Sequence, residues 1–484
     1  MDISLRNDPT RQTAAPRRKR PKVPRAVLLL GLTSLLTDIS SEMVTAVLPI
    51  FLTLQLGLSP AQFGVVDGLY RGISGVSRLV AGVLADLLRK PKLVATIGYG
   101  VSAATRPLLV AASSIPGVAA LISVDRIGKG IRTAPRDAMI AAASRPRTLA
   151  YNFGVHRAMD NAGAMMGPLL AFGVLFVVPG RFDAVFVVSS AFALLGLAVI
   201  WILVPARPTP IPTKRRATDR PRTVRTGGCR TSRSAENAGQ PGSADDASGQ
   251  DGAEEACARW STALRCRTCG STAPRSGHAL EPRRVTPRDL ARLARSRGFA
   301  GRVALAGAFT AFTVSDAFVF LTLLERNESL ASFFPLLAVG LGLAYAALAI
   351  PMGRLADRLG RMRTYLIGHV VLLGVYVLVA GPLGAIPGTI LTLLMLGLYY
   401  AATDGVLAAS VSAVLPKEAR TTGLALAQTV VAGAAMVSSV VFGLLLGTLG
   451  IGQAYLIMGA GLLLVLLVAR PMLVPAAQES QEVE

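Results

Sequence analysis

The sequence predicts an all-α polytopic membrane protein built from two six-helix bundles. Of its 484 residues 52% are hydrophobic and 16% are charged, and the mean hydropathy is +0.52. A soluble domain has about 25% charged residues, so this balance excludes an ordinary globular chain. Apolar runs of about 20 residues, enough to cross a bilayer as a helix, recur about twelve times. A long polar segment separates two groups of six such runs.

The predicted spans follow one another with short breaks rich in proline, glycine and charge. The first group covers residues 26–56, 62–85, 93–113, 116–143, 150–178 and 184–204, and the second covers 299–324, 330–354, 362–380, 387–409, 421–448 and 453–468. The predicted domains are a basic tail (1–25), an N-terminal bundle (26–204), a linker (205–298), a C-terminal bundle (299–470) and a short tail (471–484). The first run is too long for a signal peptide and lacks a small-residue cleavage site, so we expect it to remain in the mature protein.

Lysine and arginine predict the orientation. They gather in the first tail and in every second break, at residues 86–92, 144–147, 353–363 and 416–420, whereas the intervening breaks carry few. Basic loops face the cytoplasm, so both termini and the linker are predicted to be cytoplasmic and the protein to lie in the plasma membrane. This bias and the basic linker account for the net charge of +22 without a nucleic-acid partner.

The linker has the composition of a disordered segment, rich in Arg, Ser, Gly, Pro and Ala. It holds all four cysteines, Cys229, Cys257, Cys266 and Cys269. One C-x-x-C pair with two irregularly placed partners is a weak zinc signal. We therefore expect reduced thiols and no metal site.

The two halves contain an internal repeat. "GVLADLLRKPK" begins at Gly82, after the second span, and "GRLADRLGRMR" begins at Gly353, after the eighth. The same motif at the same place in each half indicates two parallel repeats, as in transporters with pseudo-two-fold symmetry.

With this repeat the chain resembles the major facilitator superfamily, whose loop signature is G-x-L-A-D-R-x-G-R followed by Arg or Lys. The second copy matches at Gly353, Leu355, Asp357, Arg358, Gly360, Arg361 and Arg363, whereas the first departs at Leu87 and Arg89. The resemblance implies the major facilitator fold. It also implies a gating role for the loops, in which Asp86 and Asp357 form charge latches with their basic neighbours.

Two further patterns of the superfamily are present. Arg126 and Gly130 match R-x-x-x-G in the fourth span, and Gly163, Gly167 and Pro168 match G-x-x-x-G-P in the fifth. The second resembles the pattern typical of proton-coupled exporters, although helix packing through small residues would use the same spacing. Together with "LTDISSEM" and "DRIGKGIRTAPRDA", the motifs resemble a poorly characterised prokaryotic branch and favour export.

Charged residues inside the N-terminal spans are the predicted proton-coupling site. Asp38 lies roughly 18 Å along the first helix from residue 26, near mid-bilayer, and Glu42 follows one turn later on the same face. Ionised groups at this depth are costly unless they are paired or face water. We expect Asp38 and Glu42 to exchange protons beside Arg126 and Arg106. For Arg78, Arg132, Arg136 and Asp137, nearer the cytoplasmic face, structural ion pairs are the favoured interpretation.

The predicted solute site involves both halves. Its members are Asp67, Arg71, Asp316, Tyr399 and Asp404. The basic residues of the N-terminal half favour an anionic or zwitterionic solute, whereas Asp316 and Asp404 would suit a cation, so the class of solute stays open.

The sequence contains no G-x-x-x-x-G-K followed by Ser or Thr and no complete dinucleotide fingerprint. We therefore expect neither an enzyme nor a cofactor. The prediction is a secondary transporter that exports a small solute in exchange for protons across the lipid bilayer. The alternatives are a proton-coupled importer and, from another class, a membrane scaffold or sensor acting through its basic linker, whose deletion would separate them.

Overall fold

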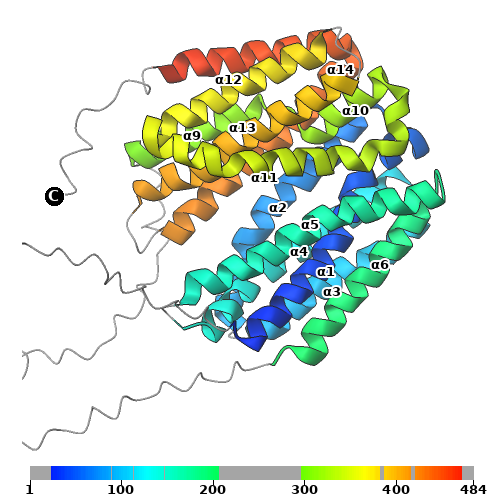
Figure 1. Ribbon diagram of the computed structural model, residues 1–484, viewed down its shortest axis with the longest axis vertical. Coiled ribbons are helices and arrows are strands. Elements are labelled where there is room, and N and C mark those ends of the chain that lie inside the picture. The colour runs from blue at the N-terminus through cyan, green and yellow to red at the C-terminus, as the bar shows by residue number, and fades with distance from the viewer. Residues whose placement is uncertain are drawn as a thin grey trace, which may run out of the picture. The chain divides into compact units, whose positions relative to one another are not determined.

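The computed structural model describes residues 23–88, 90–112, 114–145, 148–205, 296–381, 386–415 and 420–470. Within these residues the chain is helical apart from short turns, and they contain no strand. Figure 1 shows the helices of the first half, from blue to blue-green, side by side, and those of the second half, from bright green through yellow to red, forming a second group. The predicted all-α architecture is confirmed.

The first half contains six helices, two of which end in a π-helical turn. They are α1 (Arg25–Ile50) with η1 (Phe51–Gln55), α2 (Pro60–Leu88), α3 (Pro91–Ala111), α4 (Ile115–Ala143), α5 (Leu149–Val177) and α6 (Phe182–Ala198) with η3 (Val199–Leu203). The breaks between them are short, so successive helices run antiparallel. In space α1 packs mainly on α5 and α6, and α4 packs on α2 and α3.

The second half has the same number of spans but two irregularities. Its elements are α9 (Arg297–Ala311), α10 (Asp316–Arg326), η4 (Glu328–Phe333), α11 (Phe334–Leu359), α12 (Arg361–Ala380), α13 (Ile386–Ala413) and α14 (Arg420–Ala469). The last contains two spans joined at Gly450, whose φ of 79° requires the left-handed conformation that glycine tolerates. The predicted seventh span is divided into α9 and α10.

One tyrosine stabilises the break in the seventh span. The Tyr376 hydroxyl on α12 donates to the Phe312 carbonyl and accepts from the Val314 amide, both at 2.8 Å. Ser315 then begins α10 by accepting from the Phe318 amide. An interruption inside a membrane needs such partners, because an unpaired backbone group there costs several kcal/mol. The break is therefore a built feature of the fold.

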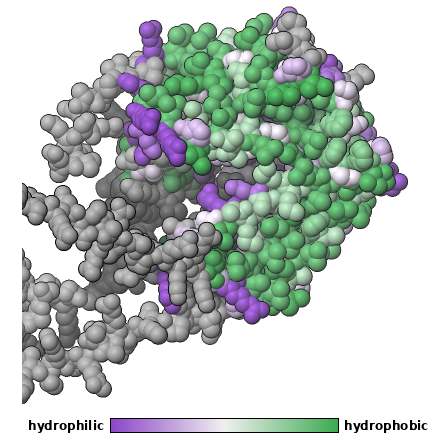
Figure 2. All heavy atoms as spheres, viewed as in Figure 1, coloured by the Kyte–Doolittle hydropathy of each residue, from purple (hydrophilic) through white to green (hydrophobic). Residues whose placement is uncertain are grey.

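By length and composition, nine helical segments of the described chain qualify as membrane spans. α2 and α4 are long enough but carry more charge, and the last qualifying segment, residues 423–469, holds two spans. The described residues thus contain the twelve spans that the sequence predicts. Most of the surface in Figure 2 is hydrophobic, as a bilayer-facing surface requires. Residues 206–295, which include nearly all of the predicted linker, lie outside the description.

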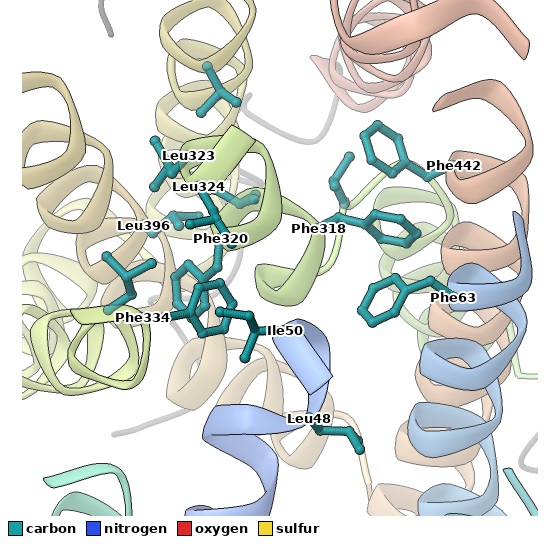
Figure 3. Close-up of a cluster of buried hydrophobic side chains, with 14 of the residues drawn as sticks. Leu48, Ile50, Phe63, Phe318, Phe320, Leu323, Leu324, Phe334, Leu396 and Phe442 are labelled. Carbon is teal, nitrogen blue, oxygen red and sulfur yellow. The ribbon is translucent and has the colours of Figure 1, made fainter. Parts of the chain in front are cut away.

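An apolar core joins the two halves near the start of α2. Figure 3 shows Phe63 from α2 beside Phe318 from α10 and Phe442 from α14, and neighbouring ring centroids lie 4.9 Å apart in edge-to-face pairs. Such pairs contribute about 0.5–1.5 kcal/mol beyond the area they bury. The rings thus bring α2, α10 and α14 together at one place in the structure.

Candidate functional site

Two acidic residues of α1 share one lysine of α4. Lys129 Nζ lies 3.4 Å from Glu42 Oε1 and 4.0 Å from Asp38 Oδ1, and Arg132 Nη2 lies 3.3 Å from the same Asp38 oxygen. The Glu42 and Lys129 side chains are 25% and 31% exposed, whereas Arg132 is buried. This group, which we call the α1–α4 cluster (Asp38, Glu42, Lys129 and Arg132), is therefore only partly buried.

A second, fully buried group lies beside it. Asp125 accepts from Arg106 at 2.8 Å and from Arg126 at 2.5 Å, and each of the three side chains is at most 5% exposed. Arg106 also donates to Ser41 on α1 at 3.1 Å. The Arg126 guanidinium lies 4.2 Å from the centre of the Tyr70 ring, in cation–π contact. This closed arrangement is typical of a structural ion pair.

The sequence predicts Arg126 and Arg106 beside Asp38 and Glu42, whereas the ion-pair partner of both arginines in the structure is Asp125. Both arginines bind Asp125, while Lys129 and Arg132 bind the α1 carboxylates. The signal that identifies the true partners is the spacing of Asp125, Lys129, Arg132 and Arg136, which recur every three or four residues and so share one face of α4.

The cluster continues along α4 to α5. Arg136 Nη1 lies 3.6 Å from Asp160 Oδ2 and 3.1 Å from the Ser34 hydroxyl, and Arg136 also pairs with Asp137. His156 lies one turn before Asp160 on α5, with its Nδ1 3.5 Å from the Asp160 carboxylate. The interpretation of Arg132, Arg136 and Asp137 as members of ion pairs agrees with these contacts.

The glycines of the fifth span bring α5 against α1 at the level of the acidic residues. A Cβ added at Gly163 would lie 2.6 Å from the Leu35 carbonyl and 3.3 Å from Asp38 Cβ, and one added at Gly167 would lie 2.8 Å from Glu42 Cβ. Pro168, next to Gly167, lies inside α5. The G-x-x-x-G-P pattern therefore serves close packing, and the packing is at the candidate proton site itself.

A separate polar group connects the two halves. Asp67 Oδ2 accepts from Arg71 Nε at 3.2 Å, on the same helix, and from the Ser439 hydroxyl of α14 at 2.6 Å. The Tyr400 hydroxyl of α13 donates to Asp316 Oδ1 at 2.6 Å, and Arg71 interacts electrostatically with Asp316. We call these five residues the interbundle cluster. It contains three of the predicted solute-site residues: Asp67, Arg71 and Asp316.

The other two predicted solute-site residues differ in exposure. Tyr399 is buried, with its ring 5.4 Å from that of His369. Asp404, one turn later on α13, is exposed. Both Asp404 and Arg157 on α5 interact electrostatically with Tyr345 on α11. Figure 2 shows hydrophilic side chains near the centre of a face that is mostly hydrophobic.

The loop residues of the second repeat lie at the end of α11. Gly360 has a φ of 94° and ends the helix, which explains a glycine at this motif position. Asp357 and Arg358 are exposed in the last turn, as is Gly353 one turn earlier, and Arg361 begins α12. In the first repeat, Asp86 belongs to α2 but its side chain is not described, and Arg89 lies outside the described residues.

Sequence reasoning missed a stripe of glycines on α2. Gly64, Gly68, Gly72 and Gly75 all face α14, and a Cβ at Gly64 or Gly68 would lie 2.5 or 2.9 Å from a backbone carbonyl of that helix. Small residues at this spacing let two membrane helices approach closely. The signal was visible in "FGVVDGLYRGISG", and the stripe is the principal contact between the halves.

The site consists of ion pairs and hydroxyls in a membrane-spanning protein. No group of three or more His, Cys, Asp or Glu side chains in the described residues is arranged to hold a metal ion. The cysteines all lie outside the description. Of the described histidines, His369 has its Nδ1 2.8 Å from the Tyr365 carbonyl and is packed among aromatic rings. The arrangement can bind and release protons and charged solutes.

Known proteins share both the sequence pattern and the fold. The family model of the Major Facilitator Superfamily matches residues 30–334 and 303–483. The uncharacterized MFS-type transporter MJ1317 of Methanocaldococcus jannaschii is 30% identical over 184 residues, 38% of this chain and 46% of that protein. The uncharacterized protein Rv2265 of Mycobacterium tuberculosis is 30% identical over 153 residues, 32% of this chain and 37% of that protein. The aligned regions thus cover less than half of these relatives.

Solved transporters have the same fold at low identity. The nucleoside transporter NupG superposes with a TM-score of 0.65 at 14% identity, covering 93% of this chain and 99% of its own. A bacterial homolog of the human lysosomal transporter Spinster gives 0.62 at 14% identity, covering 93% and 95%. A POT family transporter in complex with 5-aminolevulinic acid gives 0.65 at 13%, covering 93% and 97%. Since the family model matches both membrane halves, this chain belongs to the Major Facilitator Superfamily of membrane transporters.

Proposed function

We propose that this transporter exports a small solute from the cytoplasm in exchange for protons, and that the α1–α4 cluster is its proton site. The observation that carries the proposal is the position of Lys129, whose Nζ lies within 4.0 Å of both Asp38 and Glu42 in a partly exposed group. With Arg132 the cluster holds two carboxylates and two cations, so a proton bound by Asp38 or Glu42 changes its net charge from zero to positive.

The depth of the cluster makes its charge state matter. Ionised side chains in the middle of a membrane are costly unless they pair or face water. Protonation of Asp38 or Glu42 weakens the attraction for Lys129 and Arg132 and so changes how α1 and α4 hold together. A proton that enters from one side and leaves to the other can therefore change the equilibrium between the arrangement open to the cytoplasm and the arrangement open to the outside.

The interbundle cluster is the proposed solute site. Asp67 and Arg71 come from the N-terminal half, Asp316, Tyr400 and Ser439 come from the C-terminal half, and the halves meet at these side chains. A solute that binds Arg71 or Asp316 would contact both bundles at once. The nearby exposed Asp404 and buried Tyr399 would complete a partly apolar wall, and the loop residues around Asp86 and Asp357 would gate the exchange.

The direction of transport rests on the fifth span and on the proton gradient. The pattern typical of exporters, Gly163, Gly167 and Pro168, lies directly against Asp38 and Glu42. A proton moving inward is worth about 2.3 kcal/mol per 100 mV, before its pH contribution, and can drive a modest solute gradient. The basic breaks support cytoplasmic termini and a plasma-membrane location.

The test is proton movement in proteoliposomes that contain the full-length protein and a trapped pH dye. Amphipathic cations, organic anions and siderophore-like compounds are added to one side in turn. Antiport predicts that an active compound moves protons opposite to its own direction. Asp38→Asn should reduce this movement at least about tenfold, which corresponds to about 1.4 kcal/mol.

The matched control is Asp183→Asn, which removes a carboxylate that is paired with Arg181 at the exposed start of α6. This variant should stay within about twofold of the wild type, because surface ion pairs contribute little. Proton movement in the same direction as the solute would establish symport and refute export. Undiminished movement in Asp38→Asn would refute the assigned proton site.

A further inference from the structure

A buried histidine of the N-terminal half has no hydrogen-bond partner among the described residues. His156 is 1% exposed, and neither of its ring nitrogens is hydrogen-bonded. The nearest acceptor is Asp160 Oδ1, 3.5 Å from His156 Nδ1, and this oxygen is also without a hydrogen bond. Buried polar groups are normally paired, so this pair calls for an explanation that packing does not give.

The pair lies between the α1–α4 cluster and the basic end of the bundle. Gly163 marks the level of Asp38 on α5. With a rise of about 1.5 Å per residue, Asp160 lies about 4.5 Å and His156 about 10 Å nearer the start of the helix. The basic break at residues 144–147 precedes that start, and its charge predicts the cytoplasmic side.

Polar side chains extend the connection in both directions. Toward Asp38, Arg136 contacts Asp160 Oδ2 at 3.6 Å and Ser34 at 3.1 Å, while Arg132 contacts Asp38 at 3.3 Å. Toward the basic end, the buried Asn152, one turn before His156, donates to the Ser144 hydroxyl at 2.9 Å. Ser144 is the C-cap of α4 and borders the break.

The charges facing the pair come from three helices. On α4 they are Arg132 and Arg136, on α1 Asp38, and on α5 itself Arg157. The arginines oppose a charge on the imidazole, whereas the two carboxylates favour it. Histidine is the side chain that changes charge near neutral pH, and here its charge depends on whether Asp160 and Asp38 hold protons.

We propose that Asp160 and His156 relay protons between Asp38 and the cytoplasmic side of the bundle. The inference rests on the proposed function, because it takes Asp38 as the proton site. In the inward step the O–H bond of protonated Asp38 breaks and, through water, an O–H bond forms on Asp160. That proton then passes to His156 Nδ1, leaving the Asp160 carboxylate beside an imidazolium, which releases the proton to water at the α4–α5 break.

A purely structural histidine would behave differently. If the pair served only packing, its replacement would lower stability and affect every activity alike. A relay is needed only when net protons cross, so its loss should spare the exchange of labelled solute for unlabelled solute, in which no net proton moves. This contrast separates the two roles.

The first measurement follows the imidazole directly. Full-length protein with His278→Gln and His369→Gln keeps His156 as its sole histidine, and its ¹⁵N-labelled ring is titrated by NMR in lipid nanodiscs between pH 3 and 9. We expect a single titration whose midpoint falls by about 1–3 pH units in Asp160→Asn, since an adjacent carboxylate favours the charged ring. Asp160→Glu should restore most of the shift.

The second measurement uses the pH-dye proteoliposomes with tetraphenylphosphonium as the amphipathic cation and p-aminohippurate as the organic anion. His156→Gln should reduce proton movement at least about tenfold while exchange of the labelled probe stays within about twofold. His369→Gln, which removes an equally buried histidine outside the relay, should reduce neither.

The outcomes distinguish the relay from the proposed function. Wild-type proton movement in His156→Gln, together with its loss in Asp38→Asn, would overturn the relay and keep antiport. Undiminished proton movement in Asp38→Asn would overturn the proton site of the proposed function. If neither probe moves protons, the NMR titration decides. A ring that does not titrate, or a midpoint that is unchanged in Asp160→Asn, overturns the relay. The expected fall of the midpoint supports it.

Discussion

Gly167 lies so close to Glu42 that a Cβ on the glycine would be 2.8 Å from the Cβ of the glutamate. The same added atom would be 2.8 Å from the Ile39 carbonyl. Helix α5 therefore rests on the backbone of α1 where α1 presents its carboxylates. The spacing of α1, α4 and α5, and with it the contact between Glu42 and Lys129, depends on the absence of a side chain at this position.

Gly167→Ala is expected to separate α1 from α5 and to weaken transport. Overpacking of a tight contact costs about 1–3 kcal/mol, so the detergent-solubilised protein should unfold at a lower temperature and proton movement should fall. The control is Gly173→Ala on the same helix, where an added Cβ meets nothing within 4 Å. Equal stability of the two variants would contradict the packing argument.

Lys129→Gln is expected to weaken proton-coupled transport. Without the shared ammonium, Asp38 and Glu42 lose a partner for their charges, and an uncompensated charge inside a membrane is costly, so proton movement should fall. Lys129→Arg keeps the charge and should stay near the wild type. Unchanged proton movement in Lys129→Gln would show that the lysine does not hold these carboxylates.

Asp125→Ala is expected to impair folding more than transport chemistry. It leaves Arg106 and Arg126 buried without their shared carboxylate, and breaking a buried pair in this way costs about 3–5 kcal/mol. The yield of monodisperse protein and its melting temperature should drop sharply. The double variant Arg106→Gln with Asp125→Asn removes one charge of each sign and should recover part of the loss, whereas additive losses would argue against a coupled group.

Ser439→Ala is expected to shift the equilibrium between the two arrangements of the bundles. Its hydroxyl donates to Asp67 across the halves, and a hydrogen bond to a charged group contributes about 1.5–3 kcal/mol. Spin labels at Tyr151 and Leu359, both exposed, would report the distance between α5 and α11 in a chain whose four cysteines are replaced by serine.

In Ser439→Ala, a smaller fraction of molecules should show the distance between Tyr151 and Leu359 that belongs to the arrangement with the Asp67–Ser439 hydrogen bond. Ser438→Ala provides the control, because Ser438 donates to the Thr313 carbonyl within the C-terminal half. If both variants give the wild-type distance distribution, the bond between Asp67 and Ser439 does not hold the halves together.

Gly360→Ala is expected to disturb the loop between α11 and α12. At a φ of 94° an L-residue is strained by about 1–3 kcal/mol, so transport should slow and the melting temperature should fall. Gly353→Ala, in the same motif, places its Cβ in open space within a helix and should be tolerated. If Gly353→Ala proved the more harmful, the motif would act through contacts made in another arrangement.

The number and order of the spans could be predicted because each depends on a local property, the length of an apolar run. The break between α9 and α10 could not. Residues 311–316 read as part of an apolar helix, and the interruption depends on the hydroxyl of Tyr376, which is distant in sequence. Such a partner is supplied by tertiary packing, which periodicity does not report.

The sequence predicted the acidic residues of the candidate site but not their partners. Asp38 and Glu42 stand out because carboxylates are rare in an apolar helix. Their partners depend on which face of α4 is turned toward α1. Lys129 lies on that face and Arg126 is directed to Asp125 instead. The spacing along α4 contained that information, whereas the position of His156 against Asp160 and Arg136 required the packing of three helices.

Helix α2 contacts the buried ion pairs of the N-terminal half on one face and the C-terminal half on the other. One side carries Tyr70, whose ring lies under the Arg126 guanidinium, and Ser77, which donates to the Arg126 carbonyl. The other side carries the glycine stripe, seated on the backbone of α14. Because both faces of α2 make close contacts, we expect a rearrangement around Arg126 to be transmitted to α14 through this one helix.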